Sequence, residues 1–169
     1  MAHLRSGRKL SRRCVVQHSK VKSRSHPSGS NVSFRRQRTF AARQRMIDAI
    51  AASRVSNPVF IGGDIHSYWT TDIKADFSNP ASATVATEFV GTSITSDPPA
   101  RDLILSVLPE NPHVRYFESR YRGYVVVDLT LDRMETRFQV ISDRRDPGAT
   151  ISTLKRFVVE SDKPGVVAE

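Results

Sequence analysis

Two kinds of hydrophobic pattern follow one another from about residue 39. Residues 39 to 53 place apolar side chains three and four positions apart, with Thr39 positioned to cap the first turn. The run from Pro58 to Ile61 is continuously apolar and rich in β-branched and aromatic side chains. The patterns predict an amphipathic helix over 39 to 53 and a short buried strand over 58 to 61. A helix that leads directly into a strand is typical of layered α/β domains.

The middle of the chain predicts one further strand and one further helix. Residues 84 to 94 are rich in β-branched side chains, and Gly91 is placed as a bulge or a loop entry. Residues 96 to 112 carry a short apolar pattern between two proline-containing ends. We therefore expect a strand over 84 to 94 and a short helix between loops after it.

Alternating apolar and polar residues dominate the last third of the chain. This pattern runs through residues 113 to 143 and returns over 149 to 161. Turn residues at 121 to 123 separate the first two predicted strands, and residues 130 to 135 form a second turn. The alternation predicts an antiparallel meander or one half of a sandwich, whose apolar face must be covered by another layer.

Length and composition limit the class of protein. The chain has 169 residues, of which 38% are hydrophobic, which leaves room for one domain with a real core. Cys14 is the single cysteine, so an intramolecular disulfide framework and a multi-cysteine zinc site are excluded. No apolar run approaches the ~20 residues that a membrane-spanning helix needs.

The net charge of +9 comes from the beginning of the chain. Residues 1 to 47 hold 13 Lys or Arg and no Asp or Glu, whereas the rest holds 13 basic and 17 acidic residues. Residues 1 to 38 have too few apolar side chains to form a core, and we expect a disordered basic leader there, followed by a domain over 39 to 169. Aromatic side chains for base stacking are missing before Phe34, which argues against a nucleic-acid partner.

Part of the leader is similar to an export signal. Residues 11 to 16, SRRCVV, look like the start of a twin-arginine signal. Such a signal requires an apolar stretch after the arginine pair, and none follows. The sequence therefore leaves the localisation undetermined.

The most suggestive chemistry follows the strand predicted over 58 to 61. Gly62 and Gly63 end this strand, and Asp64 and His66 lie on the turn beyond its carboxyl end, the edge where ligands bind in open α/β sheets. A carboxylate and an imidazole two residues apart can both reach a metal ion if other ligands converge on it. In the alternative interpretation, Asp64 caps the turn by accepting backbone N–H bonds and His66 is a structural histidine near the surface. A bare G-D-x-H motif does not decide between the two.

The G-D-x-H motif belongs to one of four stretches that together resemble a known protein family. They are NPVFIGGDIHSYWTTDIK, VATEFVGTSITS, NPHVRYFESRYRGYVVVDLT and ATISTLKRFVVESDKPG. In order and spacing, the chain from about residue 40 to 169 resembles the carboxyl-terminal part of PhoD-like alkaline phosphatases, in the calcineurin-like metallophosphoesterase superfamily. The resemblance implies an α/β fold, in which two sheets pack face to face, helices flank them, and a metal centre lies at the strand ends.

The resemblance also implies a function for the G-D-x-H loop. It assigns Asp64 and His66 as metal ligands, gives Ser67 and Trp69 no more than a role in supporting the loop, and identifies no catalytic side chain. The metals implied are divalent and trivalent ions, iron with calcium neighbours, and the reaction is hydrolysis of phosphomonoesters or phosphodiesters. Members of the family are typically exported to the periplasm or beyond.

The chain departs from the family before residue 39. Family members carry most of their ligands upstream, in stretches of the G-D-x-I-Y and D-D-H-E type and on a loop with a cysteine, whose role does not transfer to Cys14. We expect a truncated fragment of a phosphatase that is inactive alone and that self-associates through uncovered apolar surface. The alternative hypothesis is a non-enzymatic binding module, whose basic leader contacts nucleic acid or an anionic surface.

The other conspicuous polar and aromatic residues are predicted to be structural. His113, at a strand start, is interpreted as structural, and Arg120 and Arg122 as solvated turn residues, although a guanidinium fork also suits phosphate oxygens. Four aromatic residues at strand spacing are assigned to the core: Tyr116, Phe117, Tyr124 and Phe157.

Overall fold

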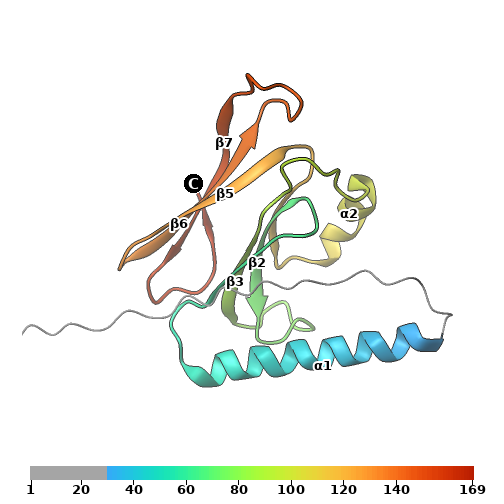
Figure 1. Cartoon of the computed structure of the whole chain (residues 1–169). Coiled ribbons are helices and arrows are strands. Elements are labelled where there is room, and N and C mark those ends of the chain that lie inside the picture. Colours follow the sequence, from blue (N-terminus) through green and yellow to red (C-terminus); the bar gives the residue numbers. More distant parts are fainter. Residues whose placement is uncertain (1–29) are drawn as a thin grey trace, which may run out of the picture.

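The described part of the chain is built from two four-stranded β-sheets packed face to face, with two helices outside them (Figure 1). The computed structural model describes residues 30–169, so the predictions for residues 1–29, including those on Cys14 and the export-like motif, lie outside the described residues. The elements are α1 Ser30–Ser53, β1 Val59–Gly62, β2 Tyr68–Lys74, β3 Thr84–Val90, α2 Arg101–Val107, the 3-10 turn η1 Leu108–Glu110, β4 Val114–Glu118, β5 Arg122–Leu129, β6 Arg133–Ile141, β7 Ile151–Glu160 and β8 Val167–Ala168.

The first sheet is mixed and has the strand order β1-β3-β2-β4. β1 and β3 are parallel, whereas β2 runs antiparallel to both β3 and β4. The sequence pattern predicted β1, β3 and β4 but missed β2, which lies directly after the G-D-x-H loop. β2 pairs with β3 on one side and with β4 on the other, so the position of the loop's end at β2 is fixed within the sheet.

The second sheet is the antiparallel meander that the alternating pattern predicts. β5, β6, β7 and β8 pair in chain order, and residues 130–132 form the predicted turn between β5 and β6. The prediction of a turn at 121–123 within one sheet is wrong. β4 pairs with β2, so residues 119–121 form a corner at which the chain crosses from the first sheet to the second.

Aromatic rings from both sheets form the core between them. The ring of Phe138 on β6 stacks on that of Tyr68 on β2 with centroids 4.7 Å apart, and it contacts Phe157 edge-on at 5.3 Å. Of the four aromatic residues assigned to the core from sequence, Phe157 is buried and Tyr116 packs against the cluster, as predicted. Phe117 instead packs on Trp69 on the outer face of the first sheet, and Tyr124 is exposed.

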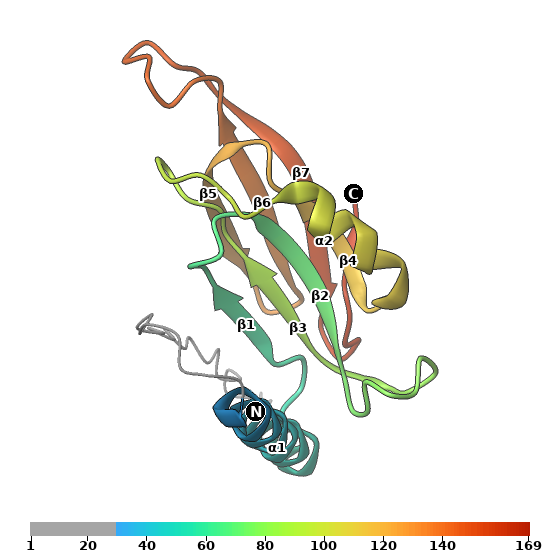
Figure 2. The same ribbon diagram turned by 90° about the vertical axis from the view of Figure 1, so that its right-hand side faces the viewer.

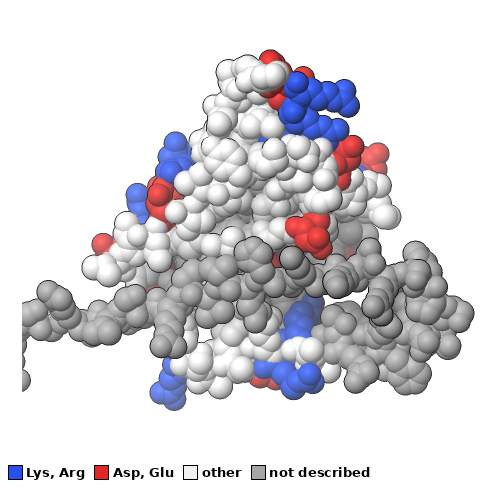
Figure 3. Space-filling model, in the orientation of Figure 1, with Lys and Arg blue, Asp and Glu red and all other residues white. Residues whose placement is uncertain are grey.

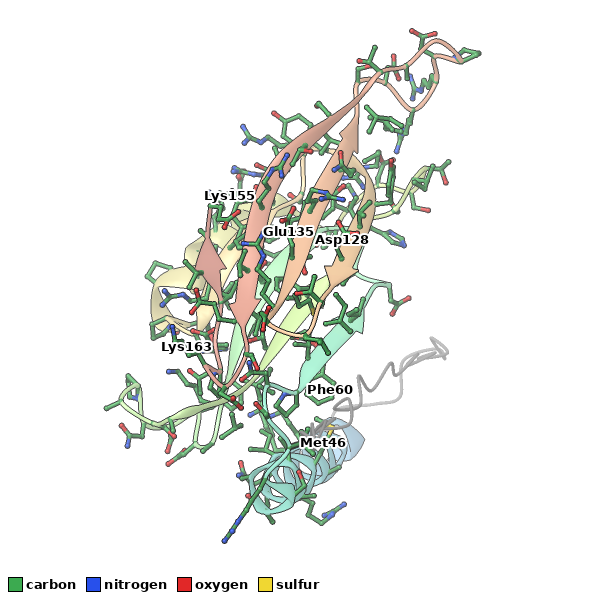
Figure 4. The ribbon with its side chains drawn as sticks, turned by 90° about the vertical axis from the view of Figure 1, so that its left-hand side faces the viewer. Met46, Phe60, Asp128, Glu135, Lys155 and Lys163 are labelled. Atoms are coloured by element: carbon green, nitrogen blue, oxygen red, sulfur yellow. The ribbon has the colours of Figure 1, made fainter. Side chains whose placement is uncertain are left out.

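The two outer faces of the sandwich differ in character. On the second sheet the outer face carries ion pairs, in which Arg137 bridges Asp128 and Glu135 (Figure 4). On the first sheet the register pairs Phe60 with Glu88 and Trp69 with Val90. Burial raises the pKa of the Glu88 carboxyl group. The outer face of the second sheet is thus charged and faces solvent, whereas the outer face of the first sheet is apolar.

The helices cover this apolar face only in part. Figure 2 shows α2 lying over β2 and β4, whereas α1 lies beyond the other end of the sheet. α2 contains no buried residue, and Leu103 on it is 70% exposed. On α1, Ile47 is buried, but Phe40 and Met46 are exposed. No described helix is long and apolar enough to cross a membrane.

The start of α1 differs from the sequence-based prediction. The helix begins at Ser30, nine residues before the predicted start, so Thr39 lies inside it and does not cap its first turn. The segment before Thr39 has no apolar periodicity, and the sequence pattern therefore gave no sign of a helix there. α1 is held at its other end, where Gln44 donates to the carbonyl of Ala75 and Arg43 lies over the ring of Phe77.

Candidate metal site

The G-D-x-H motif lies on a sharp loop after the carboxyl end of β1, as predicted, and this loop leads directly into β2. Asp64 has φ +79° and His66 has φ +58°, both in the left-handed region. Non-glycine residues seldom adopt this conformation, although Asp and His do so more readily than most. Two such residues in one five-residue loop are a local strain of the kind that clusters at functional sites.

The imidazole of His66 is oriented by a backbone carbonyl from another loop. Its Nδ1 lies 2.9 Å from the carbonyl oxygen of Asp97. Because a carbonyl can only accept, Nδ1 is the donor of this hydrogen bond, and in the tautomer with its hydrogen on Nδ1 the lone pair lies on Nε2. A histidine that donates one ring N–H to a carbonyl and offers the other nitrogen has the arrangement of a metal ligand.

Arg122 clamps the backbone of this loop to two neighbouring segments. Its Nη1 donates to the carbonyl oxygens of His66, at 3.2 Å, and Ser96, at 2.5 Å. Its Nη2 donates to the carbonyl of Ser119. Arg122 is buried, so burial lowers its pKa, and the interpretation of this residue as a solvated turn arginine is wrong. The residue joins the G-D-x-H loop to the corner between the sheets.

The other residues singled out from the sequence hold the surroundings in place. Trp69 Nε1 donates to Ser67 Oγ at 2.8 Å, which ties the end of the loop to β2. The ring of His113 packs edge-on against Phe77 at 4.8 Å, and burial lowers its pKa. Arg120 forms a two-pronged ion pair with Glu118 on the corner.

The donor chemistry of Asp64 and His66 fits a metal ion, but their number does not complete a site. The Asp64 carboxylate is exposed and His66 offers Nε2, a combination suited to hard and borderline ions. Among residues 30–169 there is no group of three or more His, Cys, Asp or Glu side chains placed to hold a metal. Because firm metal sites take three or more protein ligands, the two residues can serve only as part of a larger set.

An open cleft of about 430 Å³ lies beside this loop. Its walls come from residues 97–101, from the corner 119–122 and from residues 141–144, and they include Arg101, Arg120, Arg122 and Arg144. Asp97 and Arg122 belong both to this cleft and to the hydrogen-bond network of His66. The cleft could not be predicted from the sequence pattern, because its three segments come together only when the chain crosses between the sheets.

Comparisons with known proteins agree on one family. A model of PhoD-like phosphatases matches residues 16–138, so the match begins before the predicted domain start at residue 39. Alkaline phosphatase D of Bacillus subtilis (strain 168) is 36% identical over 129 residues, which make up 75% of this chain and 22% of that enzyme. A solved structure of PhoD matches with a TM-score of 0.67 and 36% identity, over 75% of this chain and 24% of the solved chain. The chain thus spans about a quarter of the length of these relatives.

Proposed function

The chain belongs to the PhoD-like phosphatase family, and we propose from this that it forms one part of the metal centre of a phosphoric ester hydrolase, with Asp64 and His66 as ligands. The observation that carries the proposal is the hydrogen bond between His66 Nδ1 and the Asp97 carbonyl, which leaves Nε2 as the nitrogen available to a metal ion.

Asp64, His66 and Arg122 would each have a different role at this metal centre. Bound metal ions would polarise a phosphate ester and activate water, and iron with calcium is the combination implied by the family. Asp64 would contribute a negatively charged oxygen donor and His66 a neutral nitrogen donor. Arg122 would act as a positioning residue, because its hydrogen bond to the His66 carbonyl fixes the loop backbone.

The remaining ligands would come from parts of the family fold that this chain does not span. Exposed apolar side chains on α1 and α2, such as Phe40 and Leu103, mark where those parts would pack against the first sheet. Asp64 and His66 alone would bind a metal ion weakly and would not position water for attack. We therefore propose that the 169-residue chain alone is not an efficient phosphatase.

A metal titration of the 169-residue chain tests the ligand assignment. We expect weak binding of Co²⁺, detected as a shift of the His66 ring signals in the NMR spectrum. His66→Ala and Asp64→Ala should each weaken binding by at least about tenfold, because removal of even an outer partner of a metal site costs that much.

His113→Gln is the matched control, because His113 packs against Phe77 away from the loop. This variant should bind Co²⁺ as the unaltered chain does. Binding of equal strength in His66→Ala would contradict the ligand assignment. Hydrolysis of p-nitrophenyl phosphate by the chain should stay at the level of the His66→Ala variant.

A further inference from the structure

We propose that the cleft lined by Arg101, Arg120, Arg122 and Arg144 binds a phosphate-type oxyanion. The cleft lies between the loop that leads into α2, the corner between the two sheets and the β6–β7 loop. No single stretch of sequence holds more than two of its arginines. The site is therefore a product of the fold.

The charge of the cleft is positive even after its internal ion pairs are counted. Its walls carry four arginines and two aspartates, Asp97 and Asp143. Arg144 pairs with the Asp97 carboxylate at 2.7 Å and Arg120 with the Glu118 carboxylate at 2.5 Å. Arg122 is occupied by backbone carbonyls. Figure 3 shows basic and acidic side chains side by side around the β6–β7 loop. Arg101, which no carboxylate neutralises by a described ion pair, supplies charge that is available to a ligand.

Two donors in the walls of the cleft are buried without a partner. They are Arg101 Nε and Ser119 Oγ, two of the six such side-chain atoms among the described residues. Ser119 as a whole is only 1% exposed. A buried donor left unpaired costs about 1–3 kcal/mol, which a ligand with acceptor oxygens would relieve. Both unpaired donors would therefore be satisfied by a ligand with several acceptor oxygens, and the charge of Arg101 favours a negatively charged one.

The size and remaining walls of the cleft indicate what accompanies the oxyanion. A volume of about 430 Å³ is within the range of small-molecule sites and exceeds what one phosphate ion fills. Pro98, Tyr121 and Ile141 add apolar surface beside the arginines. A guanidinium fork matches phosphate oxygens in pairs. The ligand that fits these walls is a phosphate group attached to an organic part.

Arg122 connects this cleft to the G-D-x-H loop. It lines the cleft and donates to the carbonyl of His66, so a phosphate held here lies beside the proposed metal ligands. In this respect the inference rests on the proposed function: in a substrate with more than one phosphate group, the cleft would hold a phosphate group that is not being cleaved. Binding of the oxyanion itself needs no metal ion.

The test measures binding of inorganic phosphate and of phenyl phosphate to the 169-residue chain. Binding is detected by NMR, and EDTA is present to remove metal ions. Both ligands should shift backbone signals in residues 97–101, 119–122 and 141–144. Arg101→Ala and Ser119→Ala should each weaken binding at least about tenfold. Arg145→Ala is the matched control, because Arg145 lies on the same loop as Arg144 but does not line the cleft. Each variant is first checked for an unchanged melting transition.

The two ligands separate the sources of the phosphate. Tighter binding of phenyl phosphate than of inorganic phosphate supports a substrate group in the cleft, whereas equal binding supports free phosphate as the ligand. His66→Ala should leave both affinities unchanged, so that failure of the metal assignment does not affect this result. Shifts that are absent, or that persist equally in both Arg101→Ala and Ser119→Ala, overturn the proposal.

Discussion

Phe138→Ala is expected to lower the free energy of unfolding by about 3–5 kcal/mol, the usual cost of removing a buried phenyl ring. Phe138 is completely buried and lies at the centre of the aromatic cluster. Its ring contacts Tyr68 and Phe89 from the first sheet, at centroid distances of 4.7 and 6.4 Å, and Phe157 from its own sheet. Because both sheets pack on this ring, its removal should loosen the whole sandwich.

Urea denaturation of the unaltered and Phe138→Ala chains measures this effect. Leu131→Ala is the control, because Leu131 is 87% exposed in the turn between β5 and β6. Its free energy of unfolding should change by less than about 0.5 kcal/mol. A loss below about 1 kcal/mol for Phe138→Ala would show that the two sheets do not share the core described here.

Gly123→Ala is expected to be nearly as damaging, at roughly 3 kcal/mol, because the added methyl group has no space. A Cβ at this position would overlap the carbonyl oxygen of Gln139 and lie 2.5 Å from the hydroxyl of Tyr68. That hydroxyl donates to the same carbonyl, so β5 passes directly beneath a hydrogen bond between the two sheets. To admit the methyl group, the backbone of β6 would have to move.

Thermal and urea unfolding of Gly123→Ala should be compared with Gly63→Ala. A Cβ at Gly63 meets nothing within 4 Å, so this control should leave stability nearly unchanged. Adding Tyr68→Phe to Gly123→Ala should not restore stability, because the overlap with the backbone of Gln139 remains. Full stability of Gly123→Ala would mean that β5 and β6 pair differently from the register described.

Elements with a strong local signal could be predicted from the sequence. The run before Gly62 is a strand, the G-D-x-H motif lies on the loop after it, and the alternation after Gly123 is a meander. In contrast, β2 was missed because Thr70, Thr71 and Asp72 read as polar. All three are buried, because β2 lies between β3 and β4 in the sheet, an order that the local sequence does not reveal.

Turn residues misled the prediction at the corner between the sheets. Gly123 was assigned to a turn, but it lies in β5, where a glycine is required by the close approach of Gln139 and Tyr68. The same limit applies to the candidate site. The sequence singles out Asp64 and His66 as candidate ligands, but the partner of His66 is a backbone carbonyl, which carries no side-chain signal. Arg122 likewise acts through carbonyls, so its role appears only in the fold.

The activity of a chimera tests directly whether Asp64 and His66 belong to a metal centre. The segment of B. subtilis alkaline phosphatase D that matches this chain is replaced by the corresponding residues of this chain, and phosphatase activity is measured with p-nitrophenyl phosphate. We expect an active chimera that loses activity by at least about 100-fold with either Asp64→Ala or His66→Ala, and that keeps it with His113→Gln. A chimera that stays fully active after both ligand substitutions would contradict the assignment of Asp64 and His66 to the metal centre.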